Sequence, residues 1–111
     1  AKSAGLKLGE RGGIRVDEQM RTSDHDIYAV GDAVEVHDMV TGADTLLALA
    51  GPANRQGRIA ADAIKGRPSR FRGVQGTAII GLFGTTVAWT GASEKTLRRL
   101  GREDFEKIYL Y

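Results

Sequence analysis

Gly31 and Asp32 are the residues of this chain whose types and positions most suggest chemistry. They lie in the stretch DIYAVGDAVEV, directly after the short apolar run of residues 27–30. A glycine at the carboxyl end of a buried parallel strand lets a ligand approach the backbone. A carboxylate beside it can accept hydrogen bonds from sugar or polyol hydroxyls. The dipeptide alone fits an aspartate turn better, so both interpretations stay open at this point.

A helix predicted over residues 51–65 supplies a second candidate site at its N-terminus. Pro52 suits the first turn, where its missing N–H costs nothing, and Gly66 suits the end of the helix. Unpaired N–H groups and the positive end of the helix dipole at Ala50 and Gly51 favour an anion or a developing negative charge. Water can satisfy the same groups, so the feature counts mainly because it follows the Gly-Asp pair in the next element.

Polar side chains on this helix give a third candidate site. Asn54 and Arg58 are one turn apart, share a face and could together bind an acidic ligand, since Arg suits phosphate well. A solvated helix surface explains this pair equally well, and it explains Arg55 better.

Histidines and carboxylates cluster in the first third of the chain, and a metal site could be drawn from them. The two histidines each precede an aspartate directly, and no pair has the i, i+4 spacing that helical metal motifs use. We therefore expect solvated turn residues and no metal. The group consists of Asp24, His25, Asp26, Asp32, Glu35, His37 and Asp38.

Composition narrows the possible function classes. The 111 residues include 16 basic and 14 acidic side chains, and this balance does not suggest nucleic-acid binding. The absence of cysteine excludes disulfides, thiolate metal sites and cysteine nucleophiles within this chain. No apolar run approaches the roughly 20 residues of a membrane span, and the N-terminus lacks a signal-peptide core. We expect a cytoplasmic protein that does not engage a membrane.

The elements that must position these residues follow from periodicity and turn signals. Short strands are predicted at residues 14–16 and 27–30, the second apolar on both faces as in the interior of a parallel sheet. Residues 37–47 are predicted to form an exposed excursion with Thr41-Gly42 at its tip. Small residues of the helix, including Gly57, predict close packing against its neighbour, on a face formed by Ala53, Ile59, Ala60 or Ala61, and Ile64.

The last third of the chain has a different pattern. The polar residues 67–76 mark a boundary, and two strands over 77–84 and 85–91 follow, joined by a tight turn near Gly84. Ser93 is predicted to cap a helix over EKTLRRL that Gly101 ends. The β-prone stretch FEKIYLY, residues 105–111, is predicted to be a strand. Both ends look like the middle of a longer polypeptide.

Several of these motifs resemble the pyridine nucleotide–disulfide oxidoreductases. The stretch TSDHDIYAVGD resembles the second FAD-binding motif of that family, with matches at Thr22, Ile27, Tyr28, Ala29, Gly31 and Asp32. LAGPANRQGRIAADAI resembles the helix that follows. FRGVQGTAIIGLFG, TGASEKTLRRLG and KIYLY are similar to the opening of the C-terminal dimerisation domain. The branch that this sequence most resembles contains CoA-disulfide reductase, NADH oxidase and NADH peroxidase.

The resemblance implies a fold class of α/β followed by α+β. Residues 1–70 would be the C-terminal part of a Rossmann-like FAD domain, and residues 71–111 the start of a β-β-α-β dimerisation domain in a homodimer. The chain would then be a fragment of a flavoenzyme that passes electrons from NADH or NADPH through FAD to a disulfide, persulfide, peroxide or oxygen. With no thiol and no nucleotide fingerprint, the isolated chain should catalyse nothing.

Site residues are also implied by the resemblance. Asp32 would bond the ribityl chain of FAD, with Gly31 packed against it. Backbone groups around Leu49, Ala50 and Gly51 would stabilise negative charge on the flavin. Asn54 would lie beside the disulfide substrate, and Arg58 would face an anionic portion of it. No catalytic residue is expected in this chain.

Two other functions remain open at this stage. A small α+β domain could associate through FEKIYLY and its neighbours without doing any chemistry. A metal hydrolase using the histidine and aspartate group would require bound metal.

Overall fold

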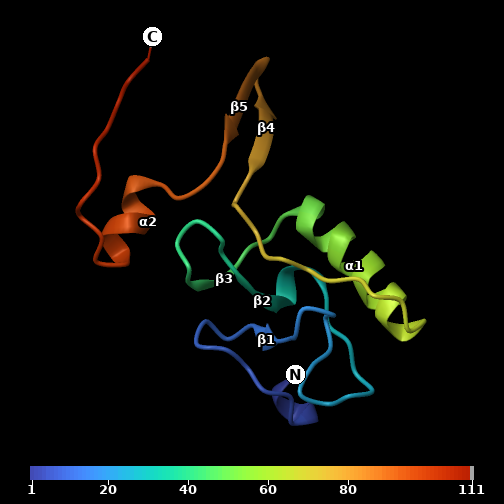
Figure 1. The fold of residues 1–111 in the computed structure, drawn as a ribbon. Coiled ribbons are helices and arrows are strands. Elements are labelled where there is room, and N and C mark those ends of the chain that lie inside the picture. The colour runs from blue at the N-terminus through green and yellow to red at the C-terminus, as the bar shows by residue number, and fades with distance from the viewer. Residues whose placement is uncertain (111) are drawn as a thin grey trace.

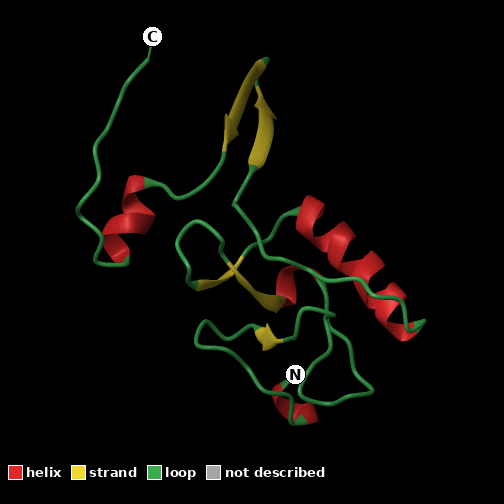
Figure 2. Ribbon diagram, in the orientation of Figure 1, coloured by secondary structure: helices red, strands yellow, loops and turns green. Residues whose placement is uncertain are grey.

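Strand β2, Val34–His37, is the centre of the first of two small sheets in the computed structural model, which describes residues 1–110. β1, Ile14–Arg15, pairs with β2 in parallel, and β3, Asp44–Leu46, pairs with its other edge antiparallel. This sheet lies beside helix α1, Ala50–Ile64 (Figures 1 and 2). The helix was predicted one residue later at each end.

The hydrophobic core lies between α1, the first sheet and the segment that follows the helix. β2 contributes Val34 and Val36, and both faces of the strand are covered, since Val34, Glu35 and Val36 are all buried. α1 contributes Ile59 and Ala60. The complete apolar cluster is Met20, Val34, Val36, Ile59, Ala60, Phe71 and Val74.

The second sheet is a hairpin of β4, Ala78–Leu82, and β5, Thr85–Trp89, which are antiparallel. Its two turn residues, Phe83 and Gly84, have φ angles of 49° and 78°. Positive φ at both positions matches the twist of a two-residue hairpin. The two predicted strands and the turn near Gly84 are thereby confirmed, and the hairpin projects away from the first sheet (Figure 1).

Helix α2, Glu94–Arg99, begins and ends as its local sequence predicts. Ser93 Oγ accepts a hydrogen bond of 3.2 Å from the backbone N–H of Thr96. Gly101 takes a φ of 72° just after the helix. Two short 3₁₀ helices complete the elements, η1 at Lys2–Ala4 and η2 at Gly31–Ala33.

The predicted strand over residues 27–30 is wrong. Within the described residues it makes only one isolated antiparallel bridge, between Tyr28 and Arg21, and Ile27 and Val30 are exposed. A strand requires a neighbour that runs alongside it, which an apolar run cannot supply alone. The Gly-Asp pair therefore precedes the parallel-paired strand β2 and does not end a strand of its own.

The strand predicted at the C-terminus is also wrong over the residues that can be described. Residues 105–110 have no ladder partner in the part of the chain that the structure describes, and Ile108, Tyr109 and Leu110 are exposed. In Figure 1 this segment leaves α2 as an extended tail. Tyr111 lies outside the described residues.

The predicted excursion over residues 37–47 is only partly correct. It contains β3, whose pairing with β2 turns most of the segment into a hairpin. Thr41 is not an exposed tip residue but is only 5% exposed. Its hydroxyl donates to Asp38 Oδ2 over 2.8 Å, and its carbonyl accepts from Arg102 Nη2 over 2.7 Å.

The face of α1 differs from the predicted one in two ways. Ile64 is 63% exposed, whereas Gln56 is 2% exposed and points inward. Gly57 allows no close approach, because a Cβ built on it would have no neighbour within 4 Å. The helix packs through Gln56, Ile59 and Ala60, with none of its buried contacts depending on a glycine.

The segment after α1 is more than a polar connection. Phe71 and Val74 are buried in the core, and Val74 exchanges backbone hydrogen bonds of 2.9 Å with His37 and Met39. Gly73 is required beside them, because its φ is 116° and a Cβ would lie 2.6 Å from the His37 carbonyl oxygen. Among residues 1–110, no helix has the length and apolar character needed to cross a membrane.

Glu94 at the start of α2 is held between two cations. Its carboxylate oxygens lie 2.6 Å from Lys107 Nζ and 2.6 Å from Arg98 Nη2. The hydrogen bond from Lys107 lowers the pKa of the Glu94 carboxyl from its ordinary value, and the charges of Arg98 and Lys107 add to this against a partial loss of hydration. The pair joins α2 to the tail that follows it.

We expect this ion pair to weaken at low pH. Because folding lowers the pKa of Glu94, its stabilisation is present above the ordinary pKa of glutamate and is lost as pH falls through the lowered value. An NMR titration of the Glu94 carboxyl should show the pKa rising more in Lys107→Ala than in Arg98→Ala. Lys95→Ala is the matched control and should change nothing; an unchanged pKa in Lys107→Ala would contradict the assignment.

Candidate functional site

Gly31 and Asp32 are positioned by a contact with the buried face of α1. The backbone N–H of Gly31 donates a 2.7 Å hydrogen bond to Gln56 Oε1. Gly31 has a φ of 82°, and a Cβ built there would lie 3.9 Å from Ala53 Cβ. The turn therefore rests directly on the first half of the helix, and the exposed side chain of Asp32 projects beside it.

The loop before this turn is held by its own hydrogen bonds. Ala29 N–H donates to the Met20 carbonyl over 3.0 Å, and Thr22 N–H donates to the Ile27 carbonyl over 2.9 Å. Arg21 lies over the ring of Tyr28, 5.4 Å from its centroid, and bonds its hydroxyl at 2.9 Å. These contacts fix the chain that leads into Gly31, although it forms no strand.

The N-terminus of α1 has unpaired backbone donors close to this turn. Leu49 is the N-cap and offers no side-chain hydrogen bond, and the first helical N–H to be bonded is that of Ala53, at 3.2 Å from the Leu49 carbonyl. Ala50 and Gly51 are exposed, and their N–H groups have no acceptor among residues 1–110. Together with the helix dipole they favour negative charge at this end.

Asn54 and Arg58 do not contact a common group among residues 1–110. Asn54 Nδ2 donates 2.9 Å to the Ala50 carbonyl of its own helix, so its amide is partly used. Arg58 is exposed on the next turn. Asp32 and the helix start are associated by contacts through Ala53 and Gln56, whereas Asn54 and Arg58 point to solvent.

The histidine and aspartate residues form only an exposed group. Metal-ligand atoms of Asp24, His25 and Asp26 lie within 4.8 Å of one another, but all three residues are exposed. Asp24 Oδ1 accepts the N–H of Asp26 at 3.0 Å, as in an ordinary turn. His37 pairs instead with Asp44 at 3.6 Å. Asp24, His25 and Asp26 therefore have the contacts of the solvated turn residues expected from the sequence, whereas His37 lies at the end of strand β2.

Gln56 is the positioning residue that sequence reasoning missed. Its helical period gives the missing signal, because it lies three residues after Ala53 and three before Ile59, on the inward face. Glu35 was expected to be a solvated turn residue, and this is wrong: it lies in β2, is buried, and its Oε2 accepts the N–H of Arg11 at 3.1 Å. The loop that contains Gly9 packs directly against the Glu35 carboxylate, since a Cβ built on Gly9 would lie 2.0 Å from it.

The residues around this site fall within a match to a known family. The sequence model described as "Pyridine nucleotide-disulphide oxidoreductase" matches residues 1–57, which is just over half of the chain. This chain belongs to the pyridine nucleotide-disulphide oxidoreductase family. The family suggested by the motifs is thereby confirmed. The matched range contains Gly31, Asp32 and the first turn of α1, and it ends before Arg58.

Named relatives in this family are redox enzymes that are much longer than this chain. A CoA-dependent NAD(P)H sulfur oxidoreductase of Pyrococcus furiosus is 37% identical over 94 residues, which are 85% of this chain and 21% of that protein. An NADH oxidase of Lactococcus lactis is 39% identical over 105 residues, 91% of this chain and 24% of that protein. This chain therefore spans about a fifth to a quarter of these relatives.

Solved structures of the pyridine nucleotide-disulphide oxidoreductases share the fold. Reduced CoADR-RHD of Bacillus anthracis is 53% identical with a TM-score of 0.85, over 92% of this chain and 18% of that one. An NAD-dependent persulfide reductase from A. fulgidus is 46% identical with a TM-score of 0.86, over 91% of this chain and 19% of that one. The mixed α/β arrangement agrees with these neighbours.

Gln56 gives a direct test of how the site is held. In Gln56→Leu the side-chain volume is nearly kept, but the Gly31 N–H loses its acceptor, which should cost about 1–3 kcal/mol of the free energy of unfolding. Urea denaturation measures this loss. Gln75→Leu is the matched control, since Gln75 is exposed, and it should change stability by less than about 0.5 kcal/mol. Equal stability of the two variants would contradict the role of Gln56.

Proposed function

We propose that this chain forms one flavin-contacting edge of an FAD-dependent NAD(P)H oxidoreductase. The observation that carries the proposal is the bond between Gly31 N–H and Gln56, which holds Asp32 beside the N-terminal half of α1. A hydroxyl-accepting carboxylate on η2 and unpaired N–H groups on α1 then lie on elements that contact each other, although strands β2 and β3 separate them in the chain. Membership of the family and the redox names of its relatives support it.

The residues of this chain fit such a cofactor. Asp32 is exposed, and its carboxylate accepts no hydrogen bond from residues 1–110, so it is available to ribityl hydroxyls. Gly31 leaves room beside it, because the nearest side-chain atom to a built Cβ is 3.9 Å away. Ala50 and Gly51, with Leu49 as N-cap, offer donors and a positive dipole end to the electron-rich part of the flavin.

The chemistry belongs to the cofactor, and the role of this chain is to bind and orient. Bound FAD supplies the capacity to take a hydride from NADH or NADPH and to release electrons to an acceptor. The chain has no cysteine, so a thiol acceptor must come from elsewhere in the enzyme. The relatives' names include sulfur, persulfide and oxidase activities. We propose that the acceptor is a disulfide, persulfide, peroxide or oxygen.

Two finer assignments complete the proposal. Residues 1–70 form part of an FAD domain, residues 71–111 begin a dimerisation domain, and the chain is one part of a longer enzyme. Asn54 and Arg58 line the substrate side of α1. Their exposure and their positions one turn apart support this assignment, although the bond from Asn54 to the Ala50 carbonyl must rearrange to free the amide.

Loss of the Asp32 carboxylate should weaken flavin binding. Charge-assisted hydrogen bonds contribute about 1.5–3 kcal/mol, so Asp32→Asn should raise the Kd for FAD by roughly 10- to 100-fold. Quenching of flavin fluorescence on titration with the chain measures the Kd. Asp26→Asn is the matched control, because it removes the same charge from an exposed turn outside the site. Equal affinity of Asp32→Asn and the unchanged chain would contradict the proposal.

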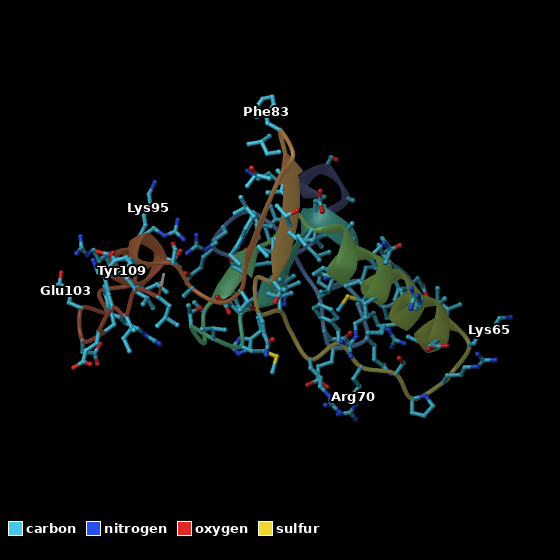
Figure 3. The ribbon with its side chains drawn as sticks, turned by 90° about the horizontal axis from the view of Figure 1, so that it is seen from above. Lys65, Arg70, Phe83, Lys95, Glu103 and Tyr109 are labelled. Atoms are coloured by element: carbon cyan, nitrogen blue, oxygen red, sulfur yellow. The ribbon has the colours of Figure 1, made fainter. Side chains whose placement is uncertain are left out.

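Exposed apolar side chains favour a second candidate function, self-association without chemistry. Ile79 is 73% exposed and Phe83 is 98% exposed, and Phe83 lies at the tip of the β4–β5 hairpin, away from the rest of the chain (Figure 3). Ile108 and Leu110 in the unpaired tail are also exposed. An isolated two-stranded hairpin is marginal in water, so a further strand from the same chain or a second copy would stabilise it. A homodimer fits this surface.

The two candidate functions respond to different changes. Ile108→Ser combined with Leu110→Ser, or removal of residues 105–111, should abolish self-association measured by sedimentation equilibrium, because both remove exposed apolar surface. Asp32→Asn should leave self-association unchanged. If the double variant associates as strongly as the unchanged chain, the tail plays no part in the dimer.

A further inference from the structure

A cavity of ≈ 500 Å³ lies between the start of α1 and the segment that follows the helix. Its walls are mostly apolar and include Leu47, Phe71 and Val74. Among residues 1–110, Arg55 and Arg72 are its only charged lining residues, one on α1 and one on the segment opposite. A cavity with two guanidinium groups and no carboxylate carries an uncompensated positive charge.

The backbone beneath each arginine is fixed by a buried neighbour. Arg55 precedes Gln56, which is buried and bonded to the Gly31 N–H. Arg72 follows Phe71, which is buried and whose N–H donates 2.7 Å to the Glu18 carbonyl. These contacts fix the backbone at Arg55 and at Arg72. Each guanidinium group can therefore move only by rotation of its own side chain.

The same segment is held from its other side as well. Gly73 passes so close to β2 that a Cβ on it would lie 2.6 Å from the His37 carbonyl oxygen. Val74 then exchanges two backbone hydrogen bonds with β2 and the turn after it. The wall that carries Arg72 is therefore part of the core packing, so the cavity is preformed.

Neither arginine has an acidic or carbonyl partner within residues 1–110. Other arginines do have one: Arg67 pairs with Asp62, Arg70 with Glu18, and Arg98 with Glu94. Two unpaired guanidinium groups at one apolar cavity repel each other, and an anion between them relieves that repulsion. Guanidinium matches phosphate geometry with two parallel hydrogen bonds.

This cavity shares Gly51 with the helix start that is proposed to contact flavin, but it lies away from the Asp32 side of that feature. Arg55 is one residue before Gln56, about 100° around the helix axis from the side chain that contacts Gly31. Asp32 does not line the cavity. The two sites also have opposite charge, a carboxylate in one and two guanidinium groups in the other.

We propose that this cavity binds the phosphate group of a small molecule that also has an apolar or aromatic part. The phosphate bridges Arg55 and Arg72, and the apolar part lies against Leu47, Phe71 and Val74. The sequence had assigned Arg55 to the solvated helix surface. Its position opposite Arg72 is a feature of the fold, since 17 positions separate the two residues in the chain.

Phenyl phosphate is a suitable probe because it combines both parts of the expected ligand. We expect its titration into ¹⁵N-labelled chain, without flavin, to give saturable amide shifts at residues 53–56 and 71–77. Inorganic phosphate should shift the same amides with weaker affinity, and phenol should not. Arg55→Gln and Arg72→Gln should each raise the Kd about tenfold. Both side chains are exposed and unbonded, so the variants should fold.

Arg15→Gln is the matched control, because Arg15 is an exposed arginine outside the cavity, and it should change the Kd less than about twofold. An equal loss in Arg15→Gln would show a general charge effect and overturn the site. Phenol binding as tightly as phenyl phosphate, inorganic phosphate binding as tightly as the ester, or shifts absent from residues 53–56 and 71–77 would also overturn it. The titration contains no flavin and Asp32 does not line the cavity, so a failure here is distinguishable from a failure of flavin binding at Asp32.

Discussion

The hydrogen bond from the Gly31 N–H to Gln56 Oε1 is the contact on which the site of this chain depends. It is 2.7 Å long and joins two segments 25 residues apart. A buried amide side chain is tolerated only when its polar atoms have hydrogen-bond partners. The turn supplies a donor for the Gln56 carbonyl oxygen, and the helix supplies an acceptor for the Gly31 N–H. This bond positions Asp32 beside α1, because the loop that precedes Asp32 is not part of a sheet.

Buried polar groups perform the same task elsewhere in the fold. Glu35 on β2 accepts the N–H of Arg11 and so closes the N-terminal loop onto the sheet. Thr41, also buried, accepts from Arg102 and ties the β2–β3 turn to the segment after α2. The apolar core contains few large side chains, and these polar contacts fix how loops meet the first sheet. That explains how a small core supports several long irregular segments.

Local signals in the sequence predicted the elements that depend on local interactions. Pro52 and Gly66 bounded α1 to within one residue, Gly84 predicted the hairpin turn, and Ser93 predicted the start of α2. Each of these signals acts through backbone geometry or capping within a few residues. The family was also recognisable, because its motif is read directly from consecutive positions.

Features that depend on distant partners were not predicted correctly. The run of residues 27–30 looked like a buried strand, but within residues 1–110 it makes only one isolated bridge, to Arg21, and no continuous ladder. The strand predicted at residues 105–110 is wrong for the same reason. Gln56 was missed because its polarity hid its inward position, and the cavity between Arg55 and Arg72 requires the fold to bring two segments together. Hydropathy indicates whether a residue prefers burial, but it does not indicate which segment of the chain lies next to it in the fold.

The most direct test of the flavin-contacting role is a ¹⁵N NMR titration of the chain with FAD. If Gly31, Asp32 and the start of α1 form the contact, the amides of Gly31, Asp32, Ala50 and Gly51 should shift together and saturate at one Kd. The amides of Asp24 and Asp26 should then stay in place. Shifts confined to the β4–β5 hairpin, or no saturable shift at Asp32 and the start of α1, would contradict it.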